Sequence, residues 1–391
     1  TALVLALMAI LGIGLGSAQW LPLLELVRQN FRTGSATLRE ILGWAYPPRR
    51  IISLFLPNFF GNPTHHSYFD LFSWQRVPVT HNALGEPSDT IYWGIKNYVE
   101  GASHLGLLPT LLALVALVRW RGRHIGFFGL TALVSILFVF GSPLYAVVYH
   151  LPGLNQVHSP FRWIYPYSLS MALLAGMGLE ALGARGARPT RRWPKLARWL
   201  TERLLPPLVA GGGAALLAML ALSLMLKERV AALAEGVLHS LALAPQAFAD
   251  GRMFFSYQFG NLLFFALMAL LSGLALALRP RFRRAAGWGG VVVLLTLGEL
   301  FFYGQGFFPA NDPKLVGYRT PAIAWLQSDA ELFRLTSYVG GSEKTFNANA
   351  GMIYNLADVR GYDSIIPRQY VAYMNLIQEQ VELPYNRIAP I

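Results

Sequence analysis

The chain has 391 residues, of which 54% are hydrophobic and 13% are charged, and it contains no cysteine. Soluble domains carry about 25% charged residues. The composition therefore excludes a disordered tail, a disulfide-stabilised scaffold, a zinc-finger protein and almost any ordinary cytosolic enzyme. The net charge of +12 would suit a nucleic-acid-binding protein, but the positions of the basic residues argue against a nucleic acid partner.

Apolar blocks long enough to cross a lipid bilayer recur along the chain. A transmembrane helix needs about 20 predominantly apolar residues. Segments of this kind predict a membrane protein of the all-α class with about seven transmembrane helices, at Ala2–Gln19, His104–Val118, Ile125–Tyr149, Ile164–Leu182, Pro207–Leu226, Phe259–Leu278 and Trp288–Tyr303.

The short connections that follow the second, fourth and sixth segments are strongly basic. Residues 119–124, 183–206 and 279–287 together contain 14 Lys and Arg but a single acidic residue, Glu202. Basic residues in short loops stay on the cytoplasmic side. The pattern predicts that 20–103, 150–163, 227–258 and the tail lie outside. The positive charge therefore indicates how the chain is oriented in the membrane, and not a nucleic acid partner.

The long outer segment 20–103 is too aromatic to be disordered. Thr37 and Glu40 form a capping-box pattern at the start of a short helix, which Pro47 and Pro48 end. A second short apolar helix is expected to run to Pro57. Both are too short to span a bilayer, and we expect them to lie in the outer interface, where Trp and Tyr are enriched.

A cluster of polar side chains follows this region. His65, His66, Tyr68 and Asp70 lie within six residues and could contact a substrate, transfer protons or bind a metal, because His and Asp are common metal ligands. The spacing matches no established metal motif. The alternative is polar surface at the mouth of a cavity, so no cofactor is predicted and a divalent metal is kept only as an alternative.

The connection 150–163 holds a basic candidate. Arg162 follows Pro160 at the expected level of the outer headgroups, with His158 near enough to assist. Arg162 could extend to lipid phosphates as an anchor. It could also bind the phosphate of a lipid-linked substrate, because a guanidinium makes bidentate phosphate contacts.

Two features inside the apolar segments are also informative. Glu299 lies about one turn inside the outer boundary of the last segment, where an acid has either a functional role or the structural role of capping a neighbouring helix. The run Gly211–Gly213 is typical of close helix packing.

The tail is less apolar and mixes helix and strand patterns. A helix is expected near Thr320, a strand around Leu332–Tyr338, another helix within GMIYNLADV, and a helix from Pro367. We therefore predict two regions, a transmembrane region at 1–303 and the start of an extracytoplasmic α/β domain at 304–391. Since Thr1 lies directly in an apolar segment and no signal pattern is visible at either end, an internal fragment of a longer membrane protein is expected.

Several segments, in order and spacing, resemble the YfhO family of bacterial membrane proteins. They are FLPNFFGNP, FGSPLYAVVYHLPGLNQVHSPFRWIYPYS, GELFFYGQGFFPANDPKL and NANAGMIYNLADVRGYDS, within about Gly16 to Tyr373. The family is similar to GT-C glycosyltransferases, so the resemblance implies transfer of a sugar from a polyprenyl-phosphate donor to a cell-envelope polymer or lipid, at the bacterial plasma membrane. Pro160–Arg162 matches the family pattern and is implied as a lipid-phosphate contact.

The resemblance assigns no catalytic residue. GT-C enzymes carry their catalytic acid in the first outer loop, to which Glu25 and Asp70 do not correspond. Two alternatives stay open, namely a transporter or flippase of lipid-linked sugars or envelope polymers, and a non-catalytic membrane scaffold. Discontinuous helices and paired half-repeats would favour transport, whereas an acid in a first outer loop would favour the enzyme.

Overall fold

The computed structural model describes residues 2–32, 36–119, 122–151, 159–183, 195–282, 284–307, 310–338 and 346–390. The chain forms two compact units, one made of Thr1–Ser35 with Ala310–Ile391 and the other of Ala36–Pro309. The sequence suggested a boundary after residue 303 and did not anticipate that the first residues group with the tail.

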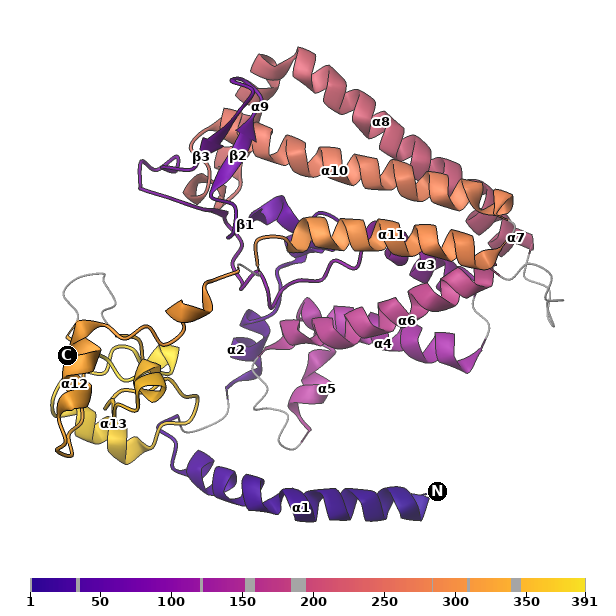
Figure 1. Cartoon of the computed structure of the whole chain (residues 1–391). Coiled ribbons are helices and arrows are strands. Elements are labelled where there is room, and N and C mark those ends of the chain that lie inside the picture. Colours follow the sequence, from indigo (N-terminus) through magenta and orange to yellow (C-terminus); the bar gives the residue numbers. More distant parts are fainter. Residues whose placement is uncertain are drawn as a thin grey trace. The chain divides into compact units, whose positions relative to one another are not determined.

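The second unit is built mainly from long apolar helices (Figure 1). They are α3 (Leu107–Val118), α4 (Arg123–Val139), α6 (Ile164–Gly183), α8 (Leu205–Met225), α10 (Gly251–Leu278) and α11 (Ala285–Gly304). A short helix α7 (Lys195–Arg198) and a π-helical turn η5 (Trp199–Leu204) continue directly into α8. The connections contain α5 (Tyr145–Tyr149), η4 (Pro160–Trp163), α9 (Lys227–Ser240), η6 (Ala244–Gln246) and η7 (Arg279–Arg281).

Six of the seven predicted apolar segments each lie on one helix, whereas Ile125–Tyr149 is divided between α4 and α5. Among the described residues, four helices are long and apolar enough to span a membrane, at Ala2–Arg28, Lys195–Met225, Gly251–Arg281 and Ala286–Gly304. Helices α3 and α4 have 12 and 17 residues, short of a full crossing. Membrane-spanning helices are therefore supported, while the total of seven stays a prediction.

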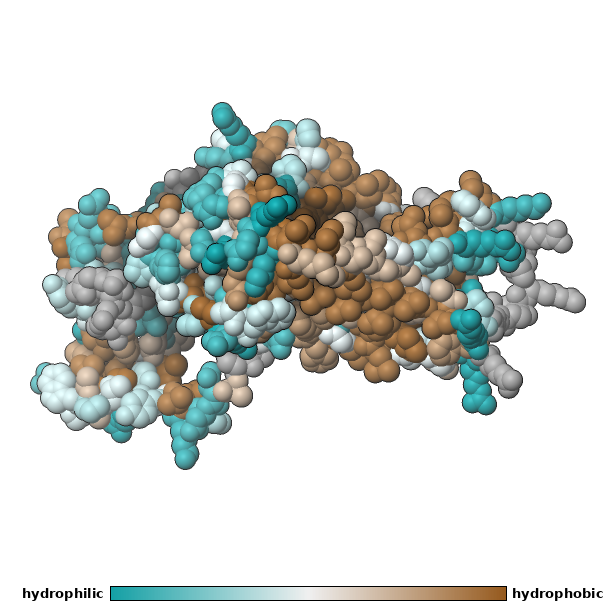
Figure 2. Space-filling view, turned by 90° about the horizontal axis from the view of Figure 1, so that it is seen from above, coloured by the Kyte–Doolittle hydropathy of each residue, from teal (hydrophilic) through white to brown (hydrophobic). Residues whose placement is uncertain are grey.

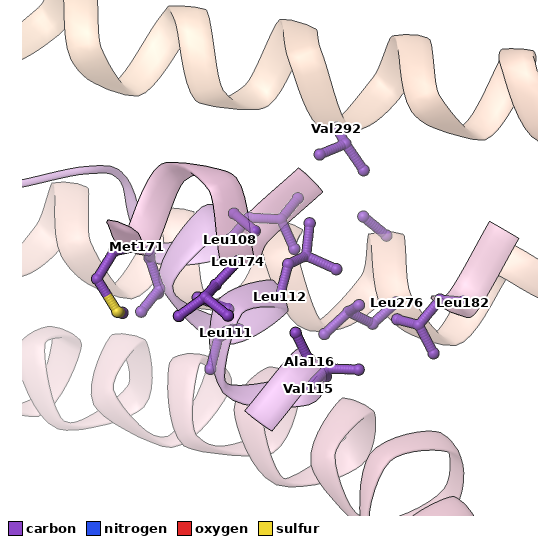
Figure 3. Packing of buried hydrophobic residues seen from close by; sticks show 14 of the residues in the cluster. Leu108, Leu111, Leu112, Val115, Ala116, Met171, Leu174, Leu182, Leu276 and Val292 are labelled. Atoms are coloured by element: carbon purple, nitrogen blue, oxygen red, sulfur yellow. The ribbon is translucent and has the colours of Figure 1, made fainter. Parts of the chain in front are cut away.

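The largest core of this unit surrounds α3. Leu108 and Leu112 on α3 pack with Leu174 on α6, and Leu276 on α10 and Trp288 on α11 belong to the same cluster (Figure 3). Complete burial of one such side chain contributes about 1.5–3 kcal/mol. In Figure 2 hydrophobic residues form a band over the helices and hydrophilic residues gather beyond it, which is the pattern that a bilayer requires.

The segment between residues 36 and 103 folds into short elements on this unit. Helix α2 (Leu38–Gly43) begins with the predicted capping box, in which the Thr37 hydroxyl accepts from the Glu40 amide and Glu40 accepts from the Thr37 amide. The predicted second helix is a 3-10 helix. The remaining elements are η1 (Pro48–Leu54), η2 (Pro57–Phe60), the antiparallel pair β1 (Gly61–Asn62) and β4 (Ile91–Tyr92), and the hairpin β2 (Ser67–Asp70) and β3 (Gln75–Pro78).

Segments that the charge pattern assigned to one side of the membrane contact one another. The Ala83 amide donates to the Phe248 carbonyl at 2.8 Å, which joins two connections predicted to be outside. Arg119, which begins a connection predicted to be inside, donates to Thr201 and Glu202 of another such connection, at 2.8 and 2.6 Å from Nη2. The contacts are consistent with the predicted arrangement of the connections.

The first unit combines α1 (Ala2–Arg28) with the tail. α1 is apolar and has no buried residue, as expected of a helix that lipid surrounds. The chain after α1 pairs with the tail, since the Phe31 amide donates to the Ile366 carbonyl and the Arg368 amide to the Gln29 carbonyl, both at 2.9 Å. The tail contains η8 (Pro313–Leu315), α12 (Pro321–Ser328), η9 (Ala350–Tyr354), α13 (Arg368–Asn375) and η10 (Leu383–Tyr385).

The tail helices predicted near Thr320 and from Pro367 are confirmed, whereas the helix predicted within GMIYNLADV is only the short 3-10 helix η9. The α/β expectation is not met in the described part of the tail. The strand expected around Leu332–Tyr338 is reduced to one parallel bridge between Leu335 and Asp358. The Asp358 carboxylate accepts from the Arg360 amide at 2.9 Å. This turn directs the segment after Asp358 away from Leu335, so the pairing ends after one bridge. A single bridge cannot extend into a sheet.

Candidate functional site

A cavity of about 230 Å³ lies in the second unit, at one end of α11. Its walls come from three parts of the chain, the 3-10 helix η1 with Pro57, the segment 98–104, and the end of α11 with Phe307. Most of the lining is apolar. The polar and charged lining groups are Arg50, Ser53, Tyr98, Ser103, His104 and Tyr303.

Arg50 is the only permanently charged side chain among the described lining residues. It is 5% exposed, and its Nε and Nη1 atoms have no hydrogen-bond partner in the described part of the chain. Its guanidinium carbon lies 4.8 Å from the centre of the Tyr46 ring and 5.5 Å from that of Phe60. Cation–π contacts offset part of the lost hydration, but buried N–H donors left unpaired are costly, so this arrangement fits a ligand that supplies acceptors.

The neighbouring polar groups add donors and positive charge. The Tyr46 hydroxyl is buried without a described partner, and burial raises the pKa of Tyr46 to about 12, so it stays a donor. Lys96, whose ammonium lies 5.1 Å from the Trp44 ring, has its pKa lowered by burial and by the positive charge of Arg50. The unpaired donors of Arg50 and Tyr46, with the nearby ammonium of Lys96, fit an anion such as a phosphate.

His104 and Glu299 form a buried pair in the wall of the cavity. His104 Nε2 lies 3.0 Å from Glu299 Oε1, and its Nδ1 lies 2.9 Å from the Leu54 carbonyl oxygen. Since a carbonyl can only accept, Nδ1 carries a proton. A second proton must then lie between Nε2 and Oε1, which makes the pair neutral overall.

Glu299 also binds the start of α3. Its Oε2 accepts from the Leu107 amide at 2.9 Å, where the helix presents unpaired amides and the positive end of its dipole. The structural role considered for this acid, capping a neighbouring helix, is therefore confirmed, and the same contact fixes His104 beside the cavity.

The FLPNFFGNP segment connects the cavity to α10 through a buried amide network. Asn58 accepts from the Tyr98 hydroxyl at 2.5 Å and from Asn62 at 3.2 Å, while Asn261 of α10 donates to the Asn58 carbonyl at 3.2 Å. Gly61 has a φ of +80°, and a Cβ there would overlap the Ile91 carbonyl, so this turn needs glycine. These residues hold Tyr98 in the cavity wall.

The four polar residues predicted at 65–70 do not converge on one point. His65 Nδ1 lies 2.9 Å from the Tyr257 hydroxyl, and His66 Nδ1 lies 2.8 Å from the Asp89 carbonyl. Asp70 accepts from the Phe72 and Ser73 amides at 3.1 and 2.9 Å and stabilises the hairpin turn. Among the described residues no group of three or more His, Asp and Glu side chains could hold a metal ion.

Arg162 lies on η4 (Pro160–Trp163) and is largely exposed. Its side chain is 58% exposed and pairs with Glu100, with 3.3 Å between Nη2 and Oε1. It does not belong to the described lining of the cavity, although Glu100 directly precedes the lining residue Gly101. His158, predicted to assist Arg162, lies outside the described residues. Arg162 as a phosphate contact stays a prediction.

The sequence pattern of residues 48–56 predicts only an interfacial helix and does not single out Arg50 as a site residue. In a 3-10 helix, residues three apart lie on the same face, so Arg50 and Ser53 are both buried while Arg49 is exposed. A signal was present, since two arginines stand between a Pro-Pro pair and an apolar run. The type of helix was needed to decide which arginine turns inward.

Comparisons with known protein families, with curated proteins and with solved structures gave no match to this chain.

Proposed function

We propose that this chain is part of a bacterial plasma-membrane glycosyltransferase of the GT-C type, which transfers a sugar from a polyprenyl-phosphate donor to a cell-envelope polymer or lipid. The observation that carries the proposal is Arg50, a buried cation with unpaired donors in a mostly apolar cavity. An amphiphile whose phosphate meets Arg50 and whose hydrocarbon chain meets the apolar walls satisfies both parts of the lining.

The proposed reaction requires an acceptor hydroxyl to attack the anomeric carbon of the donor sugar. The new C–O bond forms while the bond between that carbon and the phosphate oxygen breaks, and the bonding pair leaves with the phosphate. Arg50 would stabilise the negative charge on the departing phosphate. The hydroxyl proton passes to a carboxylate base, which we do not assign to a residue of this chain.

The test measures binding and transfer with the same donor. The full-length protein in nanodiscs is titrated with a short-chain polyprenyl-phosphate sugar, and Arg50→Lys is compared with Arg49→Lys, whose side chain is exposed. Lys lacks the planar fork of Arg. If about 1.4 kcal/mol of contact is lost, Arg50→Lys binds on the order of tenfold more weakly, while Arg49→Lys binds as the native protein does.

A second variant guards against misfolding as the cause of lost binding. Arg50→Met removes a buried charge whose donors are unpaired, so we expect it to abolish binding at undiminished thermal stability. Equal affinity of the native and Arg50→Met proteins would refute the site. Binding without sugar transfer would favour a transporter or a scaffold. The parallel variant Arg162→Lys decides whether Arg162 also contacts the phosphate.

A further inference from the structure

The hairpin β2–β3 has a rigid, well-defined turn. The Asp70 carboxylate accepts from the Ser73 hydroxyl at 2.6 Å in addition to its two amide contacts, and the Trp74 amide donates to the Asp70 carbonyl at 2.9 Å. Trp74 has a φ of +56°, in the left-handed region that a bulky residue adopts rarely. The turn therefore holds Trp74 in one strained orientation.

The turn is docked on the helix ends beside it (Figure 1). The Leu71 amide donates to the Ser256 hydroxyl at 3.2 Å, and Lys227 Nζ donates to the Leu71 carbonyl at 3.2 Å. Phe72 lies between two cations, with 5.1 Å from its ring centre to Lys227 Nζ and 4.8 Å to Arg252 Cζ. These contacts set the hairpin at the level of Lys227 and Ser256.

That level is the boundary of the apolar helices. The candidate span Lys195–Met225 stops two residues before Lys227, where the polar helix α9 begins. The 31-residue stretch Gly251–Arg281 is about 46 Å long at 1.5 Å per residue, well beyond the roughly 30 Å of a hydrocarbon core. The stretch is therefore long enough for its first residues, including Arg252 and Ser256, to reach the headgroup level.

The aromatic residues that flank this turn are exposed. Phe69 and Trp74 are 50% and 61% exposed, and their rings meet edge to face with 6.0 Å between the centres. Exposure of these two aromatic rings to water is unfavourable. Arg76, on β3 of the same hairpin, adds an exposed positive charge.

We propose that the hairpin tip, Phe69 with Trp74, inserts into the headgroup layer of the bilayer and anchors the segment 36–103 to the membrane surface. Aromatic rings prefer this layer, and the exposed cation Arg76 on the same hairpin suits lipid phosphates. Arg252 is paired with Glu228 at 3.0 Å and Lys227 donates to the Leu71 carbonyl, so these two cations hold the hairpin in place. The anchor sets the depth at which the hairpin, and with it Leu71 and Phe72, rests against α10. It does not depend on the proposed enzymatic function.

The test uses the absence of cysteine from the chain. Single variants Phe69→Cys and Trp74→Cys carry a nitroxide label in nanodiscs of phosphatidylglycerol and phosphatidylethanolamine, and collisions with lipid-soluble oxygen and with a water-soluble nickel chelate are compared. Leu84→Cys serves as the aqueous control, because Leu84 is 57% exposed. The preceding residue, Ala83, donates a hydrogen bond to the carbonyl of Phe248, which lies before the start of α10. Leu271→Cys, within the predicted apolar segment Phe259–Leu278 and 40% exposed, is the hydrocarbon control.

The oxygen-to-nickel collision ratio at both tip positions is expected to lie between the ratios at Leu84 and Leu271. Ratios equal to that of Leu84 at both positions would overturn the proposal. Because Phe69 has an ordinary backbone conformation, Phe69→Cys keeps the test valid if Trp74→Cys does not fold. The proposal would also be overturned if the nickel chelate reaches the labels and an added envelope polysaccharide then shields them. That result would indicate a carbohydrate-binding surface.

Discussion

In the segment 36–103, the buried Arg50 and the half-buried His65 adapt to the loss of water in different ways. Arg50 cannot lose its proton and keeps its charge beside aromatic rings, in the wall of a cavity. His65 can become neutral. Burial lowers the pKa of His65 from 6.5 to about 4, and the nearby charges of Arg76 and His66 act in the same direction. A neutral His65 can share a hydrogen bond with the Tyr257 hydroxyl.

The lowered pKa of His65 predicts a loss of stability in acid. Between pH 6.5 and about 4 the unfolded chain binds a proton at His65 that the folded chain does not, so the stabilisation is complete above pH 6.5 and is lost as the pH falls towards 4. In detergent, the thermal midpoint of the native protein should fall more between about pH 7 and about pH 5 than that of His65→Gln.

The control for this prediction is His81→Gln. His81 is exposed and contacts only its neighbour Thr80 among its described hydrogen bonds, so its replacement should leave the pH dependence unchanged. Identical pH dependence of the native protein and His65→Gln would contradict the assignment of a half-buried, neutral His65.

At the level of elements, close packing of α8 on α10 depends on single glycines. A Cβ on Gly213 would lie 2.5 Å from the Leu270 amide nitrogen, and one on Gly273 would lie 2.3 Å from the Ala210 amide nitrogen. Small residues let helix backbones approach in a bilayer, where the hydrophobic effect does not drive helix association. The Gly211–Gly213 run was expected to serve close packing, and this role is confirmed for Gly213.

Gly213→Ala should therefore destabilise the protein, whereas Gly212→Ala should not. The added methyl group at 213 forces the backbones apart, at a cost of about 1–3 kcal/mol. A methyl group at 212 meets no atom within 4 Å, and alanine favours helix by about 1 kcal/mol over glycine. The fraction of monodisperse protein left after heating in detergent measures both effects; equal losses would show that α8 and α10 do not pack closely.

For the whole molecule, the contacts between connections agree with the charge pattern, but the direction across the membrane rests on the charges alone. The basic connections meet through Arg119, whose Nη2 lies 2.6 Å from Glu202, and the connections predicted to be outside meet through Ala83 and Phe248. A bilayer separates these two groups if the apolar helices between them span it.

Cysteine labelling in intact cells tests the direction. A cysteine at Arg198, whose side chain is 62% exposed, should be shielded from an impermeant thiol reagent because basic loops stay cytoplasmic. Cysteines at Leu84 and at Met352 of the tail, both well exposed, should react. Permeabilised cells provide the control in which all three react, and labelling of Arg198→Cys in intact cells would reverse the orientation.

Local patterns in the sequence were enough for many features of this protein. The apolar segments became helices, the Thr37–Glu40 capping box formed, and the helices after Thr320 and Pro367 were confirmed. Each of these depends on residues a few positions apart, on turns and caps or on the length of an apolar run, so the physical cause is local and readable along the chain.

The cavity could not be read in this way, because its parts are far apart in the sequence. Arg50 turns inward through the geometry of a 3-10 helix, its ring contacts come from Tyr46 and Phe60, and the opposite wall comes from α11. His104 meets Glu299 across 195 residues.

The sequence by itself determined which segments avoid water, because hydropathy and charge are properties that each segment has on its own, whatever the other segments do. Only the tertiary structure decided which cation is buried without acceptors, because burial and hydrogen-bond pairing depend on atoms that folding brings together.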